Sequence, residues 1–375
     1  MAIDTKHQSL ADLCQQIRDQ AQALVQAGRT ESPVRIMEVC GTHTVSLSRS
    51  GMRSLLGGEL ALISGPGCPV CVTDQSYMDL AVDLAINHAE VTIATYGDMV
   101  RVPGRAGSLA DARAKGADVQ VVYAAHQALA MAAEQPRRQV VFLGIGFETT
   151  APATALAVRQ AQKEGLKNFS VLTTHKLVLP AMEALCADPR TRIDGFLCPG
   201  HVSVIMGYEV YRPIAQRYGK PCVVAGFEPP NIAAAILGIL GQLRDGRAAT
   251  GSVYPAASAK GNLTALAVLD EMFEVCDARW RALGTIPASG LRLKDAYAAF
   301  DAMRRFDLCE GDSYEMPGCQ CGLVITGRSQ PTDCPLFGRA CTPRTPIGPC
   351  MVSSEGSCSA YFKYHRHKTT VASKQ

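Results

Sequence analysis

Short apolar runs recur along the first two thirds of the chain, and a stretch with helical character follows most of them. The runs are rich in Val, Ile and Leu, and each ends abruptly at Gly, Thr, Pro or a charged residue. Strands without polar alternation that are separated by helices form parallel sheets covered on both faces, so the pattern predicts an α/β fold. The predicted strands are 34–39, 60–63, 91–95, 119–123, 140–145, 170–173, 195–197 and 222–225.

The pattern also predicts a division of the chain into three parts. The motifs GFETTA and GFEPPN each follow a Val-rich strand and lead into an Ala-rich helix, which favours two similarly built parallel-sheet lobes that face a central cleft. We place the first lobe at 1–135 and the second at 136–250. The remainder, 251–375, is predicted to be a helical and cysteine-rich domain.

Helical periodicity is clearest at the two ends of this pattern. Apolar residues at helical spacing predict a packing helix over 9–27, and similar spacing predicts helices over 263–282 and 291–306. Between Cys309 and Cys358 there are seven cysteines among many Pro and Gly residues. Such a segment cannot bury enough surface to fold alone, so a bound metal or docking against the lobes must hold it.

The chemically unusual residues follow directly after the predicted strands. In open parallel sheets, ligands bind beyond the carboxyl ends of the strands, so one cleft is expected to collect most of these groups. The segments concerned are 40–44, 65–71, 96–98, 146–150, 174–176, 198–201 and 226–230.

Composition excludes several classes of protein. With 47% hydrophobic and 19% charged residues, the chain of 375 residues is globular, and its net charge of +3 without a basic patch indicates neither a nucleic-acid nor a membrane partner. The longest apolar run, 232–240, is far shorter than the ~20 residues of a membrane helix, and residues 1–10 lack a signal sequence. We therefore expect a cytoplasmic protein, in which fifteen cysteines indicate metal binding or catalysis rather than a disulfide framework.

Cys68 and Cys71 form a Cys-x-x-Cys pair within GPGCPVC, where an apolar run gives way to a predicted helix. A thiol at a helix N-terminus faces unpaired backbone N–H groups, so its pKa is expected to fall. The pair can cycle between dithiol and disulfide or bind a soft metal. The alternative is a structural zinc site, which would need two further ligands nearby.

Four later cysteines have twelve, six and sixteen residues between successive members. Structural zinc sites usually take close Cys-x-x-Cys pairs, whereas dispersed thiolates in a Gly- and Pro-rich loop are typical of an iron-sulfur cluster. Cys319 and Cys350 are possible substitutes for one of the ligands. The candidate ligands are Cys321, Cys334, Cys341 and Cys358.

Two histidines and a glutamate are further candidates. His43 and His201 follow predicted strands and would act as proton donors or partners of a thiolate, or simply cap local turns. Glu148 would orient a lysine, a histidine or an incoming carrier, or else serve as an ordinary carboxylate at a helix N-terminus.

Together, these motifs resemble the HypD family of [NiFe]-hydrogenase maturation proteins. The resemblance runs from about residue 34 to 364 and includes the spacing of the four later cysteines. The motifs that carry it are CGTHT (40–44), GPGCPVC (65–71), GFETT (146–150), CPGH (198–201) and PIGPCMVSSEG (346–356).

The resemblance implies a redox-active assembly scaffold rather than a conventional turnover enzyme. An Fe(CN)2CO group would be assembled on the protein together with the small chaperone HypC, before transfer to the hydrogenase large subunit. Cyanide would arrive from HypE as a thiocyanate made with HypF from carbamoyl phosphate. The position matching the family's iron-binding thiol is Cys40, the thiol pair is Cys68 and Cys71, and a [4Fe-4S] cluster would occupy the C-terminal segment.

The chemistry of the residues agrees with this expectation. Iron that carries cyanide and carbon monoxide suits soft thiolate ligands, and releasing cyanide from a thiocyanate consumes two electrons. Our hypothesis is that Cys40 holds the iron while Cys68 and Cys71 store electrons or bind transiently, with the cluster recharging them. The alternatives are a stand-alone iron-sulfur thiol-disulfide oxidoreductase and a purely structural metal-binding adaptor.

Overall fold

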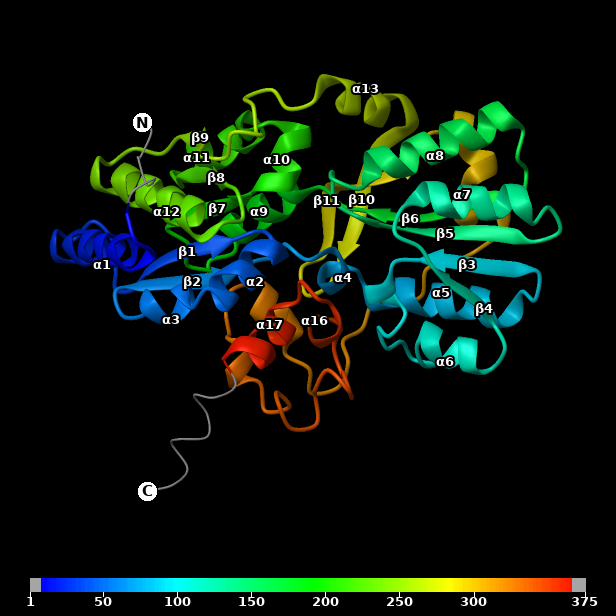
Figure 1. Ribbon diagram of the computed structural model, residues 1–375, viewed down its shortest axis with the longest axis horizontal. Coiled ribbons are helices and arrows are strands. Elements are labelled where there is room, and N and C mark those ends of the chain that lie inside the picture. The colour runs from blue at the N-terminus through cyan, green and yellow to red at the C-terminus, as the bar shows by residue number, and fades with distance from the viewer. Residues whose placement is uncertain (1–7, 366–375) are drawn as a thin grey trace.

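The computed structural model describes residues 8–365 and contains two parallel β-sheets set side by side (Figure 1). The 5-stranded sheet has the strand order β2-β1-β7-β8-β9, and the 4-stranded sheet has the order β4-β3-β5-β6. Neighbouring strands in both sheets run parallel. The predicted α/β class with two parallel-sheet lobes is therefore confirmed.

All eight predicted runs form strands, with ends within two residues of those expected. Most positions along these strands are buried, as expected for sheets covered on both faces. The 5-stranded sheet contains β1 (Val34–Glu38), β2 (Leu60–Ser64), β7 (Gly195–Pro199), β8 (Cys222–Ala225) and the unpredicted β9 (Thr250–Ser252). The 4-stranded sheet contains β3 (Val91–Thr95), β4 (Asp118–Val121), β5 (Gln139–Gly146) and β6 (Phe169–His175).

The two sheets are interleaved along the chain. The first two strands enter the 5-stranded sheet, the next four build the 4-stranded sheet, and the chain then returns to the 5-stranded sheet. The predicted boundary near residue 135 therefore falls between β4 and β5, which belong to the same sheet because both pair with β3. An apolar run predicts a strand but does not specify its neighbours.

Helices cover both sheets. The predicted helix at 9–27 is α1 (Leu10–Gln26), which begins at the Ser9 N-cap and packs on α12 (Pro229–Arg244) outside the 5-stranded sheet. The 4-stranded sheet is covered by α7 (Ala125–Glu134) and α8 (Ala151–Glu164) on one face and by α5 (Gln75–Asn87) and α6 (Leu109–Ala114) on the other (Figure 1). The connecting helices are α2 (Gly41–Arg49), α3 (Met52–Leu55), α4 (Pro69–Val72), η1 (Gly97–Met99), α9 (Val178–Ala187), α10 (Gly200–Met206), η2 (Tyr208–Tyr211) and α11 (Arg212–Tyr218).

The region after residue 263 differs from the prediction. The first predicted helix is confirmed only over α13 (Leu263–Met272), because the next residues form an antiparallel hairpin of β10 (Phe273–Trp280) and β11 (Gly284–Leu293). Apolar spacing favoured a longer helix, but pairing with β11 outweighs this local pattern. The short helices η3 (Asp295–Phe300) and α14 (Ala302–Arg305) occupy much of the second predicted helix.

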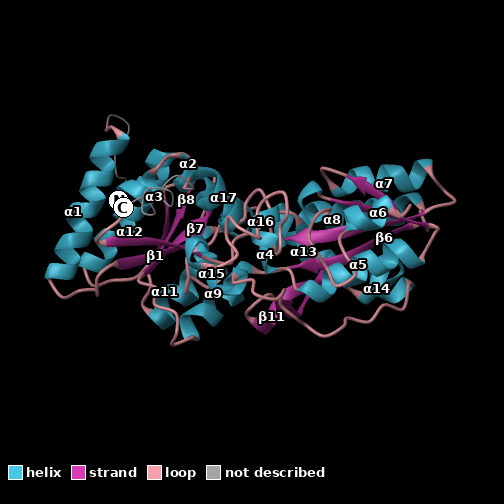
Figure 2. Cartoon of the chain, turned by 90° about the horizontal axis from the view of Figure 1, so that it is seen from below, coloured by secondary structure: helices cyan, strands magenta, loops and turns pink. Residues whose placement is uncertain are grey.

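The cysteine-rich segment docks against both lobes (Figures 1 and 2). Its helix α17 lies on α2, while α15 and α16 lie on α4. Its elements are α15 (Cys321–Ile325), η4 (Pro331–Asp333), α16 (Pro349–Val352) and α17 (Ser357–Tyr364). Among residues 8–365, no helix is both long and apolar enough to cross a membrane.

Candidate thiol and metal site

The loops that carry Cys40 and the Cys68–Cys71 pair lie against each other. They follow β1 and β2, which are parallel neighbours, so their carboxyl ends meet at one edge of the sheet. The Gly41 N–H donates a hydrogen bond to the Gly67 carbonyl over 3.1 Å. A Cβ atom on Gly67 would overlap the backbone nitrogen of Cys40, so only glycine permits this approach. The loops that carry the three candidate cysteines are therefore in direct backbone contact.

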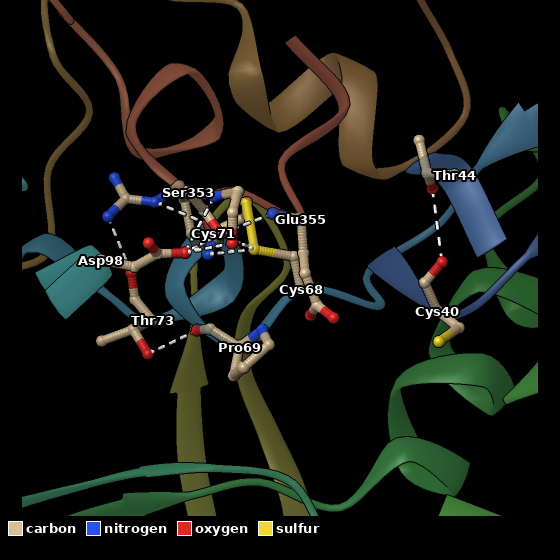
Figure 3. Close-up of a disulfide and its surroundings, with 11 residues drawn as sticks. Cys40, Thr44, Cys68, Pro69, Cys71, Thr73, Asp98, Ser353 and Glu355 are labelled. Atoms are coloured by element: carbon tan, nitrogen blue, oxygen red, sulfur yellow. Dashed lines mark hydrogen bonds between the residues drawn. A yellow bond between two sulfur atoms is a disulfide. The ribbon is translucent and has the colours of Figure 1, made fainter. Parts of the chain in front are cut away.

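Cys68 and Cys71 are joined by a disulfide at the start of α4 (Figure 3). Cys68 is the N-cap of this short helix, and its sulfur accepts a hydrogen bond from the Cys71 N–H over 3.2 Å. The two Cα atoms are 5.2 Å apart, and both side chains are buried. The pair is thus positioned for two-electron thiol chemistry, shielded from bulk solvent.

The C-terminal segment covers the disulfide. The Ser353 hydroxyl lies 3.4 Å from Cys68 Sγ and donates a hydrogen bond to the Asp98 carboxylate over 3.1 Å (Figure 3). The same carboxylate accepts hydrogen bonds from the Ser354 N–H (2.8 Å) and hydroxyl (2.9 Å). Sequence reasoning did not identify this contact, although Asp98 and both serines lie in motifs that it singled out.

Cys40 is the N-cap of α2 and is buried against Glu355. The Thr42 hydroxyl donates to Glu355 Oε1 over 2.6 Å, and a Cβ on Gly41 would come within 2.5 Å of the Glu355 Cβ. Burial, followed by the Glu355 charge, raises the pKa of the Cys40 thiol to about 11, although hydrogen bonds from the N–H groups of His43 and Thr42 oppose this rise. The free thiol therefore keeps its proton at neutral pH.

His43 and His201 both contact the ring of Phe227. The ring centroids are 5.2 Å apart for His43 and 4.2 Å apart for His201. His43 is fully buried, and its Nε2 donates to the Gly226 carbonyl over 2.9 Å. Burial lowers the pKa of His43 to about 4, so its imidazole is neutral at physiological pH and serves as a poor proton donor. His201 is exposed at the same edge of the sheet.

Glu148 comes from the other lobe, directly after β5. Its Oε1 accepts a hydrogen bond from the Val178 N–H over 2.9 Å, at the start of α9. Glu148 therefore serves as a carboxylate at a helix N-terminus, which is one of the two roles considered in the sequence analysis. Burial raises the pKa of Glu148 to about 7, and its second carboxyl oxygen has no hydrogen-bond partner among residues 8–365.

Lys176 is a buried residue for which the sequence analysis predicted no separate role. Its ammonium donates hydrogen bonds to the Arg279 carbonyl (2.7 Å) and the Thr174 hydroxyl (3.3 Å), and lies 5.5 Å from the centre of the Trp280 ring. Burial lowers the pKa of Lys176 to about 8. Its only sequence signal was its position at the end of a predicted strand.

The four predicted cluster ligands line one cavity in the cysteine-rich segment, together with Cys319. Cys350 is buried but does not line this cavity. The cavity residues are Cys319, Gln320, Cys321, Cys334, Leu336, Phe337, Cys341, Met351 and Cys358. This all-thiol donor set, surrounded by apolar side chains, fits an iron-sulfur cluster.

Other observations describe the environment of these thiols. The Ile347 N–H donates to Cys341 Sγ over 3.4 Å. A hydrogen bond with Cys321, followed by burial, raises the pKa of the Cys358 thiol. No three His, Cys, Asp or Glu side chains within residues 8–365 are grouped so as to hold a single metal ion.

The stretch 351–353 connects the two cysteine centres. Met351 lines the cysteine cavity, and Ser353 lies against Cys68. In addition, α15 and α16 both contact α4, the short helix that carries Cys71.

Comparison with known proteins gives a consistent result. The sequence model of HypD, described as the hydrogenase formation hypA family, matches residues 11–365. The chain is 46% identical to the hydrogenase maturation factor HypD of Rhodobacter capsulatus over 346 residues, which cover 90% of this chain and 92% of the relative. It is 45% identical to HypD2 of Bradyrhizobium diazoefficiens, covering 93% and 95% of the two chains, and 40% identical to HypD of Escherichia coli, covering 96% and 97%.

Proposed function

This chain belongs to the HypD family of hydrogenase maturation factors, and from that premise we propose that it is a scaffold and redox component for assembling an Fe(CN)2CO group. The iron group is the cargo. Its assembly would involve a HypC-type small chaperone and the cyanide donor HypE, and the finished group would pass to the hydrogenase large subunit.

The iron would be held by Cys40. A thiolate suits electron-rich low-spin iron, and the backbone N–H groups of Thr42 and His43 are directed at this sulfur and would stabilise its negative charge. The high pKa of the free thiol means that an arriving cation replaces the proton, so the sulfur carries little charge before iron binds.

Cys68 and Cys71 would supply the electrons that release cyanide. A thiocyanate on the donor and two thiols give a thiol on the donor, hydrogen cyanide and the Cys68–Cys71 disulfide, so the two electrons come from the dithiol. The observation that carries this proposal is the contact of Gly67 with Cys40, because cyanide would then be released beside the thiol that holds the iron. Once the disulfide has been reduced again, either thiol can also serve as a transient iron ligand.

The other candidates have supporting roles in this proposal. Neutral His43 fixes the start of α2 through the Gly226 carbonyl, which orients the N–H groups around Cys40. His201, exposed beside Phe227, would receive protons at the edge of the site. Glu148, half protonated near neutral pH, would provide or accept a proton while capping α9.

The cysteine cavity would hold a [4Fe-4S] cluster, with Cys319 as the substitute ligand. When bound, such a cluster supplies electrons one at a time. The proposed ligands are Cys321, Cys334, Cys341 and Cys358.

Infrared spectroscopy tests this proposal. The chain is purified anaerobically with its HypC-type chaperone from cells that carry the complete maturation machinery. We expect CN and CO bands from the wild-type complex, and their loss in Cys68→Ala. Cys276→Ser is the matched control, since this half-buried cysteine lies in β10. A wild-type complex without bands contradicts the assembly function, and protein-disulfide reduction without bands would support the stand-alone oxidoreductase instead.

A further inference from the structure

Glu38 is a fully buried carboxylate at the end of β1, and one of its oxygens receives donors from three other elements. The Thr44 hydroxyl in α2 donates to Oε1 over 3.2 Å, and the Ser64 hydroxyl at the end of β2 donates to it over 3.1 Å. The Arg53 guanidinium in α3 is the third donor and forms an ion pair with the carboxylate. The second oxygen, Oε2, has no hydrogen-bond partner within residues 8–365, so all three contacts depend on one atom.

Two of these contacts lead directly to the thiol loops. The Thr44 hydroxyl also donates to the Cys40 carbonyl over 3.3 Å (Figure 3). Ser64 immediately precedes the loop of the disulfide, and the next N–H, that of Gly65, donates to the main-chain carbonyl of Glu38 over 2.8 Å. Glu38 therefore fixes the start of the Cys40 loop and the start of the disulfide loop at the same time.

Arg53 extends the arrangement to the cysteine-rich segment. Its Nη1 donates to the Leu62 carbonyl in β2, and its Cζ lies 5.4 Å from the centre of the Tyr361 ring in α17, within the range of a cation–π contact. Tyr361 follows the proposed cluster ligand Cys358 by three residues on the same helix. A displacement of α17 would therefore reach Arg53 directly and Glu38 through it.

A buried ion pair is a weak source of stability, because the cost of removing both charges from water offsets much of their attraction. What such a pair can provide is a defined arrangement of the elements that it joins. Here one oxygen holds α2, α3 and β2 at hydrogen-bond distance, exactly where two thiol loops begin. A fixed placement of two reacting groups can accelerate the step between them by a large factor.

We propose that Glu38 is a positioning residue, which holds the Cys40 loop and the disulfide loop at a fixed spacing so that cyanide released at one is captured by iron at the other. The inference rests on the assembly function proposed above. It adds that the efficiency of capture depends on the hydroxyl groups of Thr44 and Ser64, which touch neither iron nor cyanide.

Benzyl thiocyanate serves as the probe for capture. The complex with the HypC-type chaperone is isolated anaerobically, its disulfide is reduced with dithiothreitol, the excess reductant is removed and ferrous iron is added. Benzyl thiocyanate and the two thiols give benzyl mercaptan, hydrogen cyanide and the Cys68–Cys71 disulfide, so the two electrons and the protons come from the dithiol. Infrared spectroscopy measures the cyanide bound to iron, and a colorimetric assay measures the free cyanide. The ratio of captured to free cyanide is the readout.

Two variants each remove one donor and leave the pair of Glu38 and Arg53 in place. We expect the ratio of captured to free cyanide to fall about fivefold in Thr44→Val and in Ser64→Ala, while the total cyanide released stays the same. Thr44→Ser keeps the hydroxyl and should restore the wild-type ratio. Ser48→Ala is the matched control, because Ser48 is buried in α2 and its hydroxyl has no hydrogen-bond partner in the described part of the chain.

The outcomes separate this inference from the proposed function. If the wild-type complex releases no cyanide, or releases it without capture on iron, the proposed function fails. If the wild type captures cyanide and both folded variants keep its ratio, only the role of Glu38 fails. Thermal unfolding of each variant measures its folded fraction. A purely stabilising role would lower total release and capture together with that fraction and leave the ratio unchanged, which would also overturn the inference.

Discussion

The two parallel sheets carry different chemistry at the carboxyl ends of their strands. The 5-stranded sheet contributes thiols, with Cys40 after β1 and Cys68 after β2, and two histidines after β1 and β7. The 4-stranded sheet contributes carboxyl and ammonium groups: Asp98 follows β3, Glu148 follows β5 and Lys176 follows β6. The candidate iron-binding thiols thus come from one lobe only, whereas groups that can transfer protons come from both.

Burial affects both sets in the same way. It raises the pKa of Cys40 to about 11 and of Glu148 to about 7, and lowers the pKa of Lys176 to about 8. Each shift favours the neutral form, since transfer from water into a region of low polarity disfavours charge. The comparison teaches that burial disfavours ionisation in both lobes, although Lys176, with a pKa of about 8, is still mostly protonated at pH 7.

The largest effect is expected at the thiols that follow the strands of the 5-stranded sheet. Cys40→Ser should remove the CN and CO infrared bands and the iron of the Fe(CN)2CO group, while cluster iron remains, because an alcohol is a far poorer ligand for soft iron than a thiolate. Iron content and infrared spectra of the purified complex measure this. Cys276→Ser should keep both signals, and a Cys40→Ser complex that retained the bands would rule out Cys40 as the iron ligand.

The next effect tests whether the thiol loops really meet. Gly67→Ala should lower the free energy of unfolding by about 4 kcal/mol, since the added methyl group overlaps the Cys40 backbone and neither loop can shift freely. Urea denaturation measures the change. Gly57→Ala is the control, because the nearest atom to its new Cβ lies 3.8 Å away. An unchanged Gly67→Ala protein would mean that the two loops are not in contact.

The sequence predicted the strands well and their pairing poorly. Apolar runs that end at Gly, Pro or polar residues identify a buried strand, and for this reason all eight were found. Pairing depends on contacts between distant segments, so neither the interleaving of the two sheets nor the position of β5 beside β3 could be read from local pattern. The β10–β11 hairpin was missed because apolar spacing over 263–282 suggested one continuous helix, whereas pairing between β10 and β11 depends on residues outside that window.

In the candidate site, too, the residue types were predictable from the sequence and the contacts between distant segments were not. The cysteines were identifiable by residue type and spacing, and the four proposed cluster ligands do line one cavity. Spacing could not decide on Cys319, which lines the cavity too. The contact of Asp98 with Ser353 joins residues that are 255 positions apart, so it had no local signal.

A smaller effect on the free energy of unfolding is expected at Glu148, and it should depend on pH. Folded Glu148 keeps its proton up to about pH 7, whereas the unfolded chain loses it near pH 4.5, so wild-type stability falls as pH rises through this window. Glu148→Gln keeps an oxygen acceptor for the Val178 N–H without the titration. We expect the variant to be about 3 kcal/mol more stable than the wild type at pH 8 and to lose this advantage near pH 4.5.

Urea denaturation at several pH values gives this comparison. Exposed Glu164 is the control residue, and Glu164→Gln should show no such dependence on pH. If the stability of Glu148→Gln follows that of the wild type at every pH, the Glu148 carboxyl group is charged in the folded protein, and burial does not raise its pKa.

The smallest expected effect concerns the segment that joins the two lobes over the disulfide. Asp98→Asn removes the negative charge of the acceptor, so the three hydrogen bonds from Ser353 and Ser354, which all reach one carboxylate oxygen, become weaker. We expect a loss of about 1–2 kcal/mol in local stability and about tenfold faster amide exchange around Ser354. Exchange followed by mass spectrometry measures it, with exposed Asp83→Asn as the control.

Because Glu355 packs on Gly41 beside Cys40, alkylation of the Cys40 thiol should also become faster in Asp98→Asn. Faster exchange with unchanged alkylation would mean that the C-terminal segment opens over the disulfide without exposing the iron thiol, and that the two sheets then act as separate halves.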